Sequence, residues 1–189
     1  MLSDDLSTRE GLPEQYRYLL DSLPRDRWHG HEVAAMARFW LQMHSGFRRE
    51  VAQMEALTTQ WRSGSLALPD LHRRLIPTLQ SFLQHLDGHH TIETHHYFPT
   101  MRQVEPRIGA GIDLLDRDHD VIHGYLETLF QTGLAFHQAA AGNAPLASDA
   151  AARLADALDQ AGPTLGRHLE DEEDIIVPLI TRHADSFRG

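Results

Sequence analysis

The sequence predicts an all-α protein that folds as a four-helix bundle. Apolar residues recur at spacings of three and four along most of the chain, which is the period of an amphipathic helix. Alternating runs of β-branched residues, which would indicate strands, do not occur. The 189 residues are enough for one domain with a sizeable core. Four long periodic segments joined by short linkers predict antiparallel neighbours.

The elements are expected in the following order. An N-terminal extension, residues 1–30, contains a short helix over residues 13–23 and is expected to lie as a flap over one end. The bundle itself is expected over residues 31–185. Its four helices are predicted at about residues 31–62, 70–104, 112–140 and 148–183, with breaks at glycine- and proline-containing segments.

The composition limits the possible partners and the chemistry. Aspartate and glutamate exceed lysine and arginine by 27 to 17, so no basic surface for nucleic acid is expected. No apolar run approaches the roughly 18 residues that span a bilayer, and no signal peptide is evident, so we expect a cytoplasmic protein that does not bind membranes. Because there is no cysteine, nitrogen and oxygen atoms must hold any metal. The 14 histidines are clustered, and histidine is the commonest metal ligand.

One motif occurs twice in the chain. His89 precedes Glu93 by four residues, and His168 precedes Glu172 by four. Side chains four residues apart lie on the same face of a helix, so each pair directs an imidazole and a carboxylate toward one point. Each copy also follows a helix that carries a histidine on its apolar stripe, which is His44 in the first case and His119 in the second.

Helical projection at 100° per residue separates inward from outward positions. Glu93, His85 and His96 fall on the side of His89, and Glu172 falls on the side of His168. His119 and His123 share one stripe, so His123 is a second inward histidine on that helix. The projection turns Asp171 and Asp174 toward solvent, puts Glu173 at the edge, and leaves His90 as a surface or packing residue.

Two inward glutamates require a cation. An isolated carboxylate in a bundle core costs several kcal/mol, and leucine would serve better there. Imidazole and carboxylate ligands suit iron, manganese, zinc or copper, and carboxylates that face each other across a bundle can bridge two ions. The number of candidate ligands therefore fits a dinuclear site.

These motifs, in this combination and order, resemble the hemerythrin family, specifically the bacterial hemerythrin-like HHE cation-binding domain. The resemblance covers roughly residues 31–183: a single histidine in the first long helix, HHxxE followed by FP in the second, DHxxxH in the third and HxxxE in the fourth. It implies an up-down-up-down bundle around a non-heme di-iron centre, although manganese or zinc is possible. The implied metal ligands are His44, His89, Glu93, His119, His168 and Glu172, together with His123, which matches a histidine of the oxygen-carrying members.

The resemblance implies a protein that binds or senses dioxygen, nitric oxide or peroxide. A di-iron oxidase or peroxide-consuming enzyme is an alternative, but the sequence shows no evident general acid or substrate pocket, so a binding protein is favoured over an enzyme. A second alternative is a helical interaction module that a metal stabilises. Whether His85, His96 or Glu173 also coordinates, which protein partner exists, and in which oligomeric state the chain works are left open.

Overall fold

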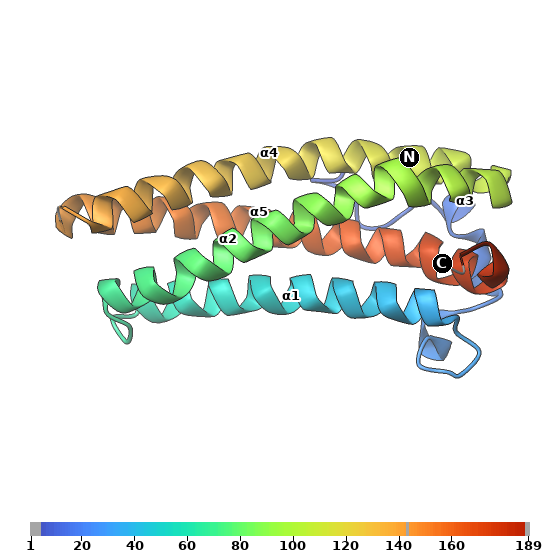
Figure 1. Cartoon of the computed structure of the whole chain (residues 1–189), viewed down its shortest axis with the longest axis horizontal. Helices are drawn as coiled ribbons and strands as arrows, with labels where there is room; N and C mark the ends of the chain where they lie inside the picture. Colours follow the sequence, from blue (N-terminus) through green and yellow to red (C-terminus); the bar gives the residue numbers. More distant parts are fainter. Residues whose placement is uncertain (1–4, 143, 188–189) are drawn as a thin grey trace. The chain divides into compact units, whose positions relative to one another are not determined.

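The structure is a computed structural model that describes residues 5–142 and 144–187, and it is all-α as predicted. Figure 1 labels its helices, α1 (Ala35–Arg62), α2 (Leu68–Ile92), α3 (Phe98–Val104), α4 (Gly109–Ala140) and α5 (Ala144–Arg182). No β-strand occurs within these described residues. Among them, no helix is both long enough and apolar enough to cross a membrane.

The helices start near the predicted positions. α1 begins at Ala35 instead of His31, and α5 begins at Ala144, earlier than the expected Ser148. The expected helix over residues 13–23 is replaced by two short 3-10 turns, Glu14–Tyr16 and Tyr18–Asp21. The helix predicted over residues 70–104 is divided, because a π-helical turn, η4 (Glu93–Tyr97), separates α2 from α3.

The spacing of the buried residues explains η4. Leu86, His90 and Glu93 are buried and follow one another at intervals of four and three, as on an α-helix. The next buried residue, Phe98, follows Glu93 by five, and Met101 then follows by three. A π-helical turn contains one additional residue, so it keeps Glu93 and Phe98 on the same buried face.

The chain forms two compact units, and each contains a segment of all four long helices. The first unit comprises the described residues up to Gly46, His90–Asp120 and those from Thr164 onward; the second comprises Phe47–His89 and Val121–Pro163. α1 and α4 therefore lead from the first unit to the second, whereas α2 and α5 lead back. This alternation is the up-down-up-down order of an antiparallel four-helix bundle.

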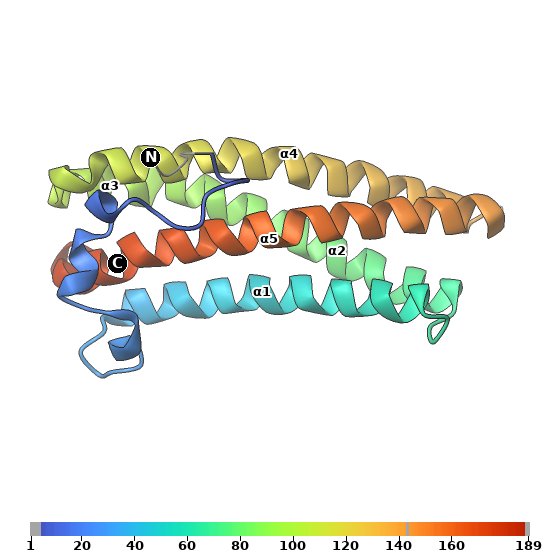
Figure 2. The ribbon, with the colours of Figure 1, turned by 180° about the vertical axis from the view of Figure 1, so that it is seen from behind.

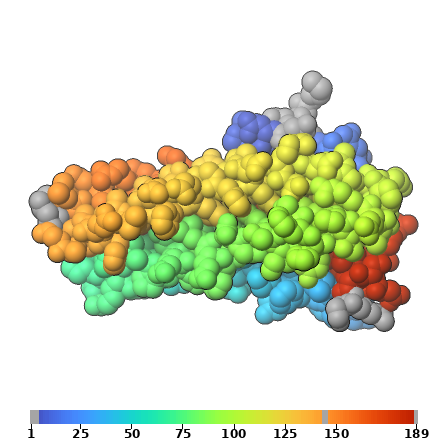
Figure 3. Space-filling model, turned by 45° about the horizontal axis from the view of Figure 1, so that its top comes forward, coloured from blue at the N-terminus to red at the C-terminus, as the bar shows by residue number. Residues whose placement is uncertain are grey.

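The N-terminal extension is part of the core of the first unit. Leu12, Leu19, Leu23 and Trp28 are buried in one hydrophobic cluster with residues of α1, α3, α4 and the end of α5. In the view from behind, the segment runs across α4 and α5 (Figure 2), and the space-filling view shows it beside α4 (Figure 3). It thus covers the helices that carry His119, His168 and Glu172.

Candidate metal centre

Five of the seven predicted ligands lie buried together in the first unit. They are His44 on α1, Glu93 at the start of η4, His119 on α4, and His168 and Glu172 on α5, and none is more than 5% exposed. His90, in the last turn of α2, joins them and is also buried. All these side chains are imidazoles or carboxylates, so their donor atoms are those that iron, manganese and zinc accept.

Three histidines form the first of two groups of possible ligands. In this three-histidine group, His90, His119 and His168 each place a ring nitrogen within 4.8 Å of the others. The ring of His90 stacks on that of His119, with centroids 4.1 Å apart, and the ring of His168 meets His90 edge-on at 5.5 Å. Three helices therefore converge on one point with nitrogen ligands.

The second group, here called the glutamate group, contains His44, Glu93 and Glu172. Their ligand atoms also lie within 4.8 Å of one another. His89 stands directly before His90 in α2 and one turn before Glu93, and it is the last residue of the second unit.

The two glutamates connect the two groups. Glu172 Oε2 lies 3.4 Å from His168 Nε2 and 3.6 Å from His44 Nε2, so one oxygen faces a histidine of each group. Glu93 Oε2 lies 3.4 Å from His119 Nε2. A carboxylate between two sets of imidazoles has the position of a bridging ligand in dinuclear carboxylate sites.

Hydrogen bonds direct two of the imidazoles. Thr94 Oγ1 donates to Asp116 Oδ1 at 2.7 Å and lies 3.1 Å from His119 Nδ1, from which it can then accept. His44 Nδ1 lies 3.1 Å from Glu173 Oε1. Protons on Nδ1 leave the Nε2 lone pairs directed at the glutamates, which is the tautomer that a metal ligand needs.

Burial makes the charged forms of both glutamates unfavourable without a cation. It raises the pKa of Glu93 to about 8. Burial, followed by repulsion from Glu93, raises the pKa of Glu172 to about 8. Trp40 Nε1 donates a hydrogen bond to Glu172 Oε1 at 3.1 Å, which fixes the carboxylate and leaves Oε2 facing His44 and His168.

The donor set fits a bound cation. His168 has no exposed surface, and its Nε2 makes no hydrogen bond within the described residues. Glu172 Oε2 makes none there either. Buried polar atoms normally have hydrogen-bond partners, and a metal ion would satisfy these atoms and stabilise the carboxylates in charged form.

The expectation that Asp171 and Asp174 face solvent is wrong, because the N-terminal extension covers this side of α5. Arg9 Nε contacts Asp171 Oδ2 at 2.8 Å, and Arg25 Nε contacts Asp174 Oδ1 at 2.6 Å. Both aspartates are buried. Helical projection treats a helix as having one buried face, and it has no means of including a covering segment from elsewhere in the chain.

His85 and His96, which the projection turned inward, are exposed. His123 is a member of neither group. It is an exposed residue of the second unit, and its Nε2 is 3.8 Å from Asp87 Oδ1. On α4 the next buried residues after His119 are Ile122 and Leu129. The buried face therefore continues at the apolar residue three positions after His119, and His123 lies outside it.

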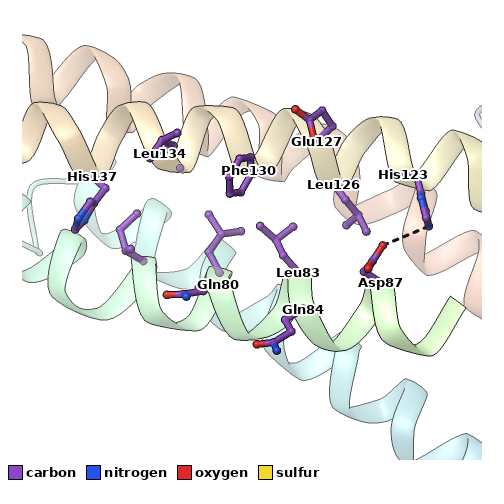
Figure 4. A pocket seen from close by; sticks show the side chains of 13 residues that line it. Gln80, Leu83, Gln84, Asp87, His123, Leu126, Glu127, Phe130, Leu134 and His137 are labelled. Carbon is purple, nitrogen blue, oxygen red and sulfur yellow. Dashed lines mark ion pairs between the residues drawn. The ribbon is translucent and has the colours of Figure 1, made fainter. Parts of the chain in front are cut away.

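His123 instead lines a pocket between α2 and α4 within the second unit (Figure 4). The pocket has a volume of about 640 Å³, with Leu83, Leu126 and Phe130 among the residues that line it. An imidazole lies at each end of the pocket (Figure 4). At one end is His123, beside Asp87. At the other is His137, whose Nδ1 is 2.9 Å from His72 Nε2.

His90 is the ligand candidate that sequence reasoning missed. The signal was present, because Leu79, Phe82 and Leu86 form the apolar stripe of α2 at spacings of three and four, and His90 continues it. The helical projection took His89 as the centre of the buried face, whereas the buried face of α2 is centred on Leu86 and includes His90. The same shift explains why His85 was expected to point inward.

Comparison with known proteins gives one match. The family model described as the hemerythrin HHE cation binding domain matches residues 35–180. No significant match was found among the curated proteins or among the solved structures with which the chain was compared.

Proposed function

Since the chain belongs to the hemerythrin family, with an HHE cation-binding domain that includes all the residues of both groups, we propose that it holds two iron ions and binds a small ligand such as dioxygen, nitric oxide or peroxide there. The observation that carries the proposal is the position of Glu172 Oε2, which faces His168 in one group and His44 in the other. One carboxylate oxygen in contact with both groups favours two ions over one.

The proposed ligands are the three-histidine group for one ion and the glutamate group for the other. His89 is included in the proposal because it lies one helical turn before Glu93 on α2. His123 is not included, because it is exposed and is a member of neither group. The ion held mainly by the glutamate group would have fewer histidines, so the two iron positions would differ.

Bound iron would supply a redox-active ion that can coordinate a small diatomic molecule or peroxide. The surrounding chain keeps that position dry. Phe98 stacks on His119 with ring centroids 5.4 Å apart, and Trp40 lies against His44 at 6.4 Å. Ile175 and Leu115 are also fully buried in the same hydrophobic cluster. Apolar walls exclude water from such a pocket and favour small uncharged ligands.

Metal analysis with visible spectroscopy tests the proposal. Protein purified from cells grown with iron is expected to contain about two irons per chain and to change its visible absorption when dioxygen, nitric oxide or peroxide is added. The Glu172→Gln variant removes the bridging charge and is expected to lose iron. Glu170→Gln, on the same helix but partly exposed, is the matched control and is expected to keep it.

A colourless protein with a single zinc ion per chain would overturn the proposal. Steady-state consumption of dioxygen or peroxide separates the enzymatic alternative from ligand binding. A spectrum that changes with ligand while no ligand is consumed supports a binding or sensing protein, whereas continuous turnover supports an enzyme.

A further inference from the structure

Arg9 is a buried cation in the N-terminal extension that contacts two helices of the first unit. Its Nε lies 2.8 Å from Asp171 Oδ2 on α5, and its Nη2 contacts Asp118 Oδ2 on α4. Both carboxylates are buried as well. The hydrogen bonds to Asp118 and Asp171 outweigh burial and raise the pKa of Arg9, so its charge persists at neutral pH.

Both carboxylates held by Arg9 adjoin candidate ligands. Asp118 immediately precedes His119, and Asp171 immediately precedes Glu172. Asp118 Oδ2, the same oxygen that Arg9 contacts, is also 3.6 Å from His168 Nδ1. The Arg9 guanidinium therefore connects the N-terminal extension to the residues that precede His119 and Glu172 in the sequence. Through Asp118 it is also connected to His168.

Arg9 determines where the carboxylate of Asp118 lies. The guanidinium is planar, and its fork of donors holds a carboxylate in a defined orientation. Asp171 has a second cationic partner, Arg167 at 2.9 Å, whereas Arg9 is the cation in contact with Asp118 among the described residues. A carboxylate beside the Nδ1 of a ligand imidazole holds the ring so that Nε2 carries the lone pair.

We propose that Arg9 is a positioning residue for the three-histidine group: it places Asp118 against His168 Nδ1 and so directs His168 Nε2 at the cation. The proposal rests on the proposed function, since it assigns this group to one of the two ions. The N-terminal extension would then help to orient a metal ligand, although it supplies no ligand in either group.

Arg25 provides a matched control. It belongs to the same extension and also pairs with a buried aspartate of α5, Asp174. Within the described residues, Asp174 contacts no member of either ligand group, and Arg25 reaches α5 without bridging to α4. A loss that follows from Arg9 but not from Arg25 would therefore come from the bridge to Asp118 and not from a missing cation on the extension.

The test is an anaerobic titration of the metal-free protein with Fe²⁺, in competition with a chelator, which measures the affinity of each iron-binding step. Two binding steps are expected, and the step that disappears in His90→Asn belongs to the three-histidine group. Arg9→Met is expected to weaken that step about 10–100-fold, the usual effect of losing a partner of a ligating histidine, and to change the other less than about threefold. Arg25→Met is expected to change both steps less than about threefold.

Arg9→Lys provides the conservative comparison. Its single ammonium keeps the charge but cannot hold two carboxylates with a planar fork, so we expect a loss smaller than that of Arg9→Met. If Arg9→Met fails to fold, Arg9→Lys decides: selective weakening of the three-histidine step supports the proposal, and wild-type binding overturns it. Equal weakening of both steps by Arg9→Met would also overturn it.

Failure of the proposed function is recognised separately, because the wild-type chain would then bind no iron. The positioning role would still be measurable in the metal-free protein by ¹⁵N NMR of the His168 ring. A tautomer protonated on Nδ1 in wild type and Arg25→Met, but lost in Arg9→Met, supports the contact with Asp118. The same tautomer mixture in all three proteins would overturn it.

Discussion

Glu93 and Glu172 are carboxyl groups without exposed surface, and their energetics depend on a cation. Without one, the folded chain binds their protons more tightly than the unfolded chain does. With a bound ion, the charged forms become the stable ones, since metal ligands must be deprotonated. Metal affinity should therefore rise with pH, whereas the stability of the metal-free fold should change in the opposite direction.

The metal-free protein is expected to lose stability as the pH rises from about 4.5 to about 8. A folded-state pKa near 8 against the ordinary 4.5 means that the folded state holds more protons in this window, so deprotonation favours unfolding. At roughly 1.4 kcal/mol per pKa unit, shifts of this direction and size lower the free energy of unfolding by several kcal/mol across the window for the pair as a whole. Urea unfolding of chelator-treated protein at several pH values measures this.

Glu172→Gln should reduce this pH dependence, because the amide does not titrate and Glu93 alone of the pair then does. Glu170→Gln should leave it as in wild type, since this side chain is partly exposed. A metal-free protein whose stability rises between about pH 5 and about pH 8 would contradict the expected sign.

Variants of His90 and His123 distinguish the ligand set that the structure indicates from the ligand set expected from the sequence. His90→Asn removes a member of the three-histidine group and is expected to reduce bound iron from about two to about one per chain. His123→Asn changes an exposed residue and is expected to leave the content at about two. Metal analysis of the two variants gives the answer, and iron loss only in His123→Asn would favour the sequence-based ligand set.

Sequence reasoning identified the ligand candidates that follow from short-range geometry. The i, i+4 pairs, His89 with Glu93 and His168 with Glu172, were identified because helical spacing alone places the two side chains of each pair on one face. The burial of Asp171 was not predictable in this way. It depends on Arg9, which is more than 160 residues away in the chain.

Among the elements, η4 is the one that the periodicity analysis should have revealed and did not. The predicted helix over residues 70–104 ran through it because three- and four-residue spacings occur on both sides. Only the five-residue interval from Glu93 to Phe98 marks the additional residue. A one-residue shift of this kind is visible only when the buried face is known on both sides of it.

Deleting His95 should be tolerated. This exposed residue lies inside η4, and its removal places Phe98 four residues after Glu93, an α-helical interval that keeps both on the buried face. We expect the free energy of unfolding to change by less than roughly 2 kcal/mol. Deleting His85, an exposed residue within α2, rotates the buried face by about 100° and should prevent folding. Urea unfolding of the two variants tests this, and similar damage from both would contradict the role given to η4.

At the scale of the whole molecule, the N-terminal extension counts as core. Leu6, Leu12, Leu19, Leu23 and Trp28 are each at most 7% exposed. At roughly 1.5–3 kcal/mol for each buried side chain, they contribute on the order of 10 kcal/mol before entropy is considered. That amount is comparable to the net stability of a typical domain, roughly 5–15 kcal/mol.

A chain that starts at residue 31 is therefore expected not to fold stably, although the family match lies entirely within it. A chain that starts at Asp5 keeps all five side chains and serves as the control. Circular dichroism and thermal unfolding compare the two, and a cooperative transition of the shorter chain at the wild-type temperature would show that the extension is dispensable.

Removal of the metal should affect the two compact units unequally. All six residues of the three-histidine group and the glutamate group belong to the first unit, and of the proposed ligands only His89, at the end of a second-unit segment, lies outside it. Without a cation, this unit keeps two buried carboxyls and several imidazoles in its core, so local opening there becomes easier. Hydrogen exchange after chelation should accelerate in residues 109–120 of α4 and 164–182 of α5, while residues 47–62 of α1, in the second unit, should keep their protection. Uniform acceleration in both units would mean that the metal stabilises the fold as one cooperative whole.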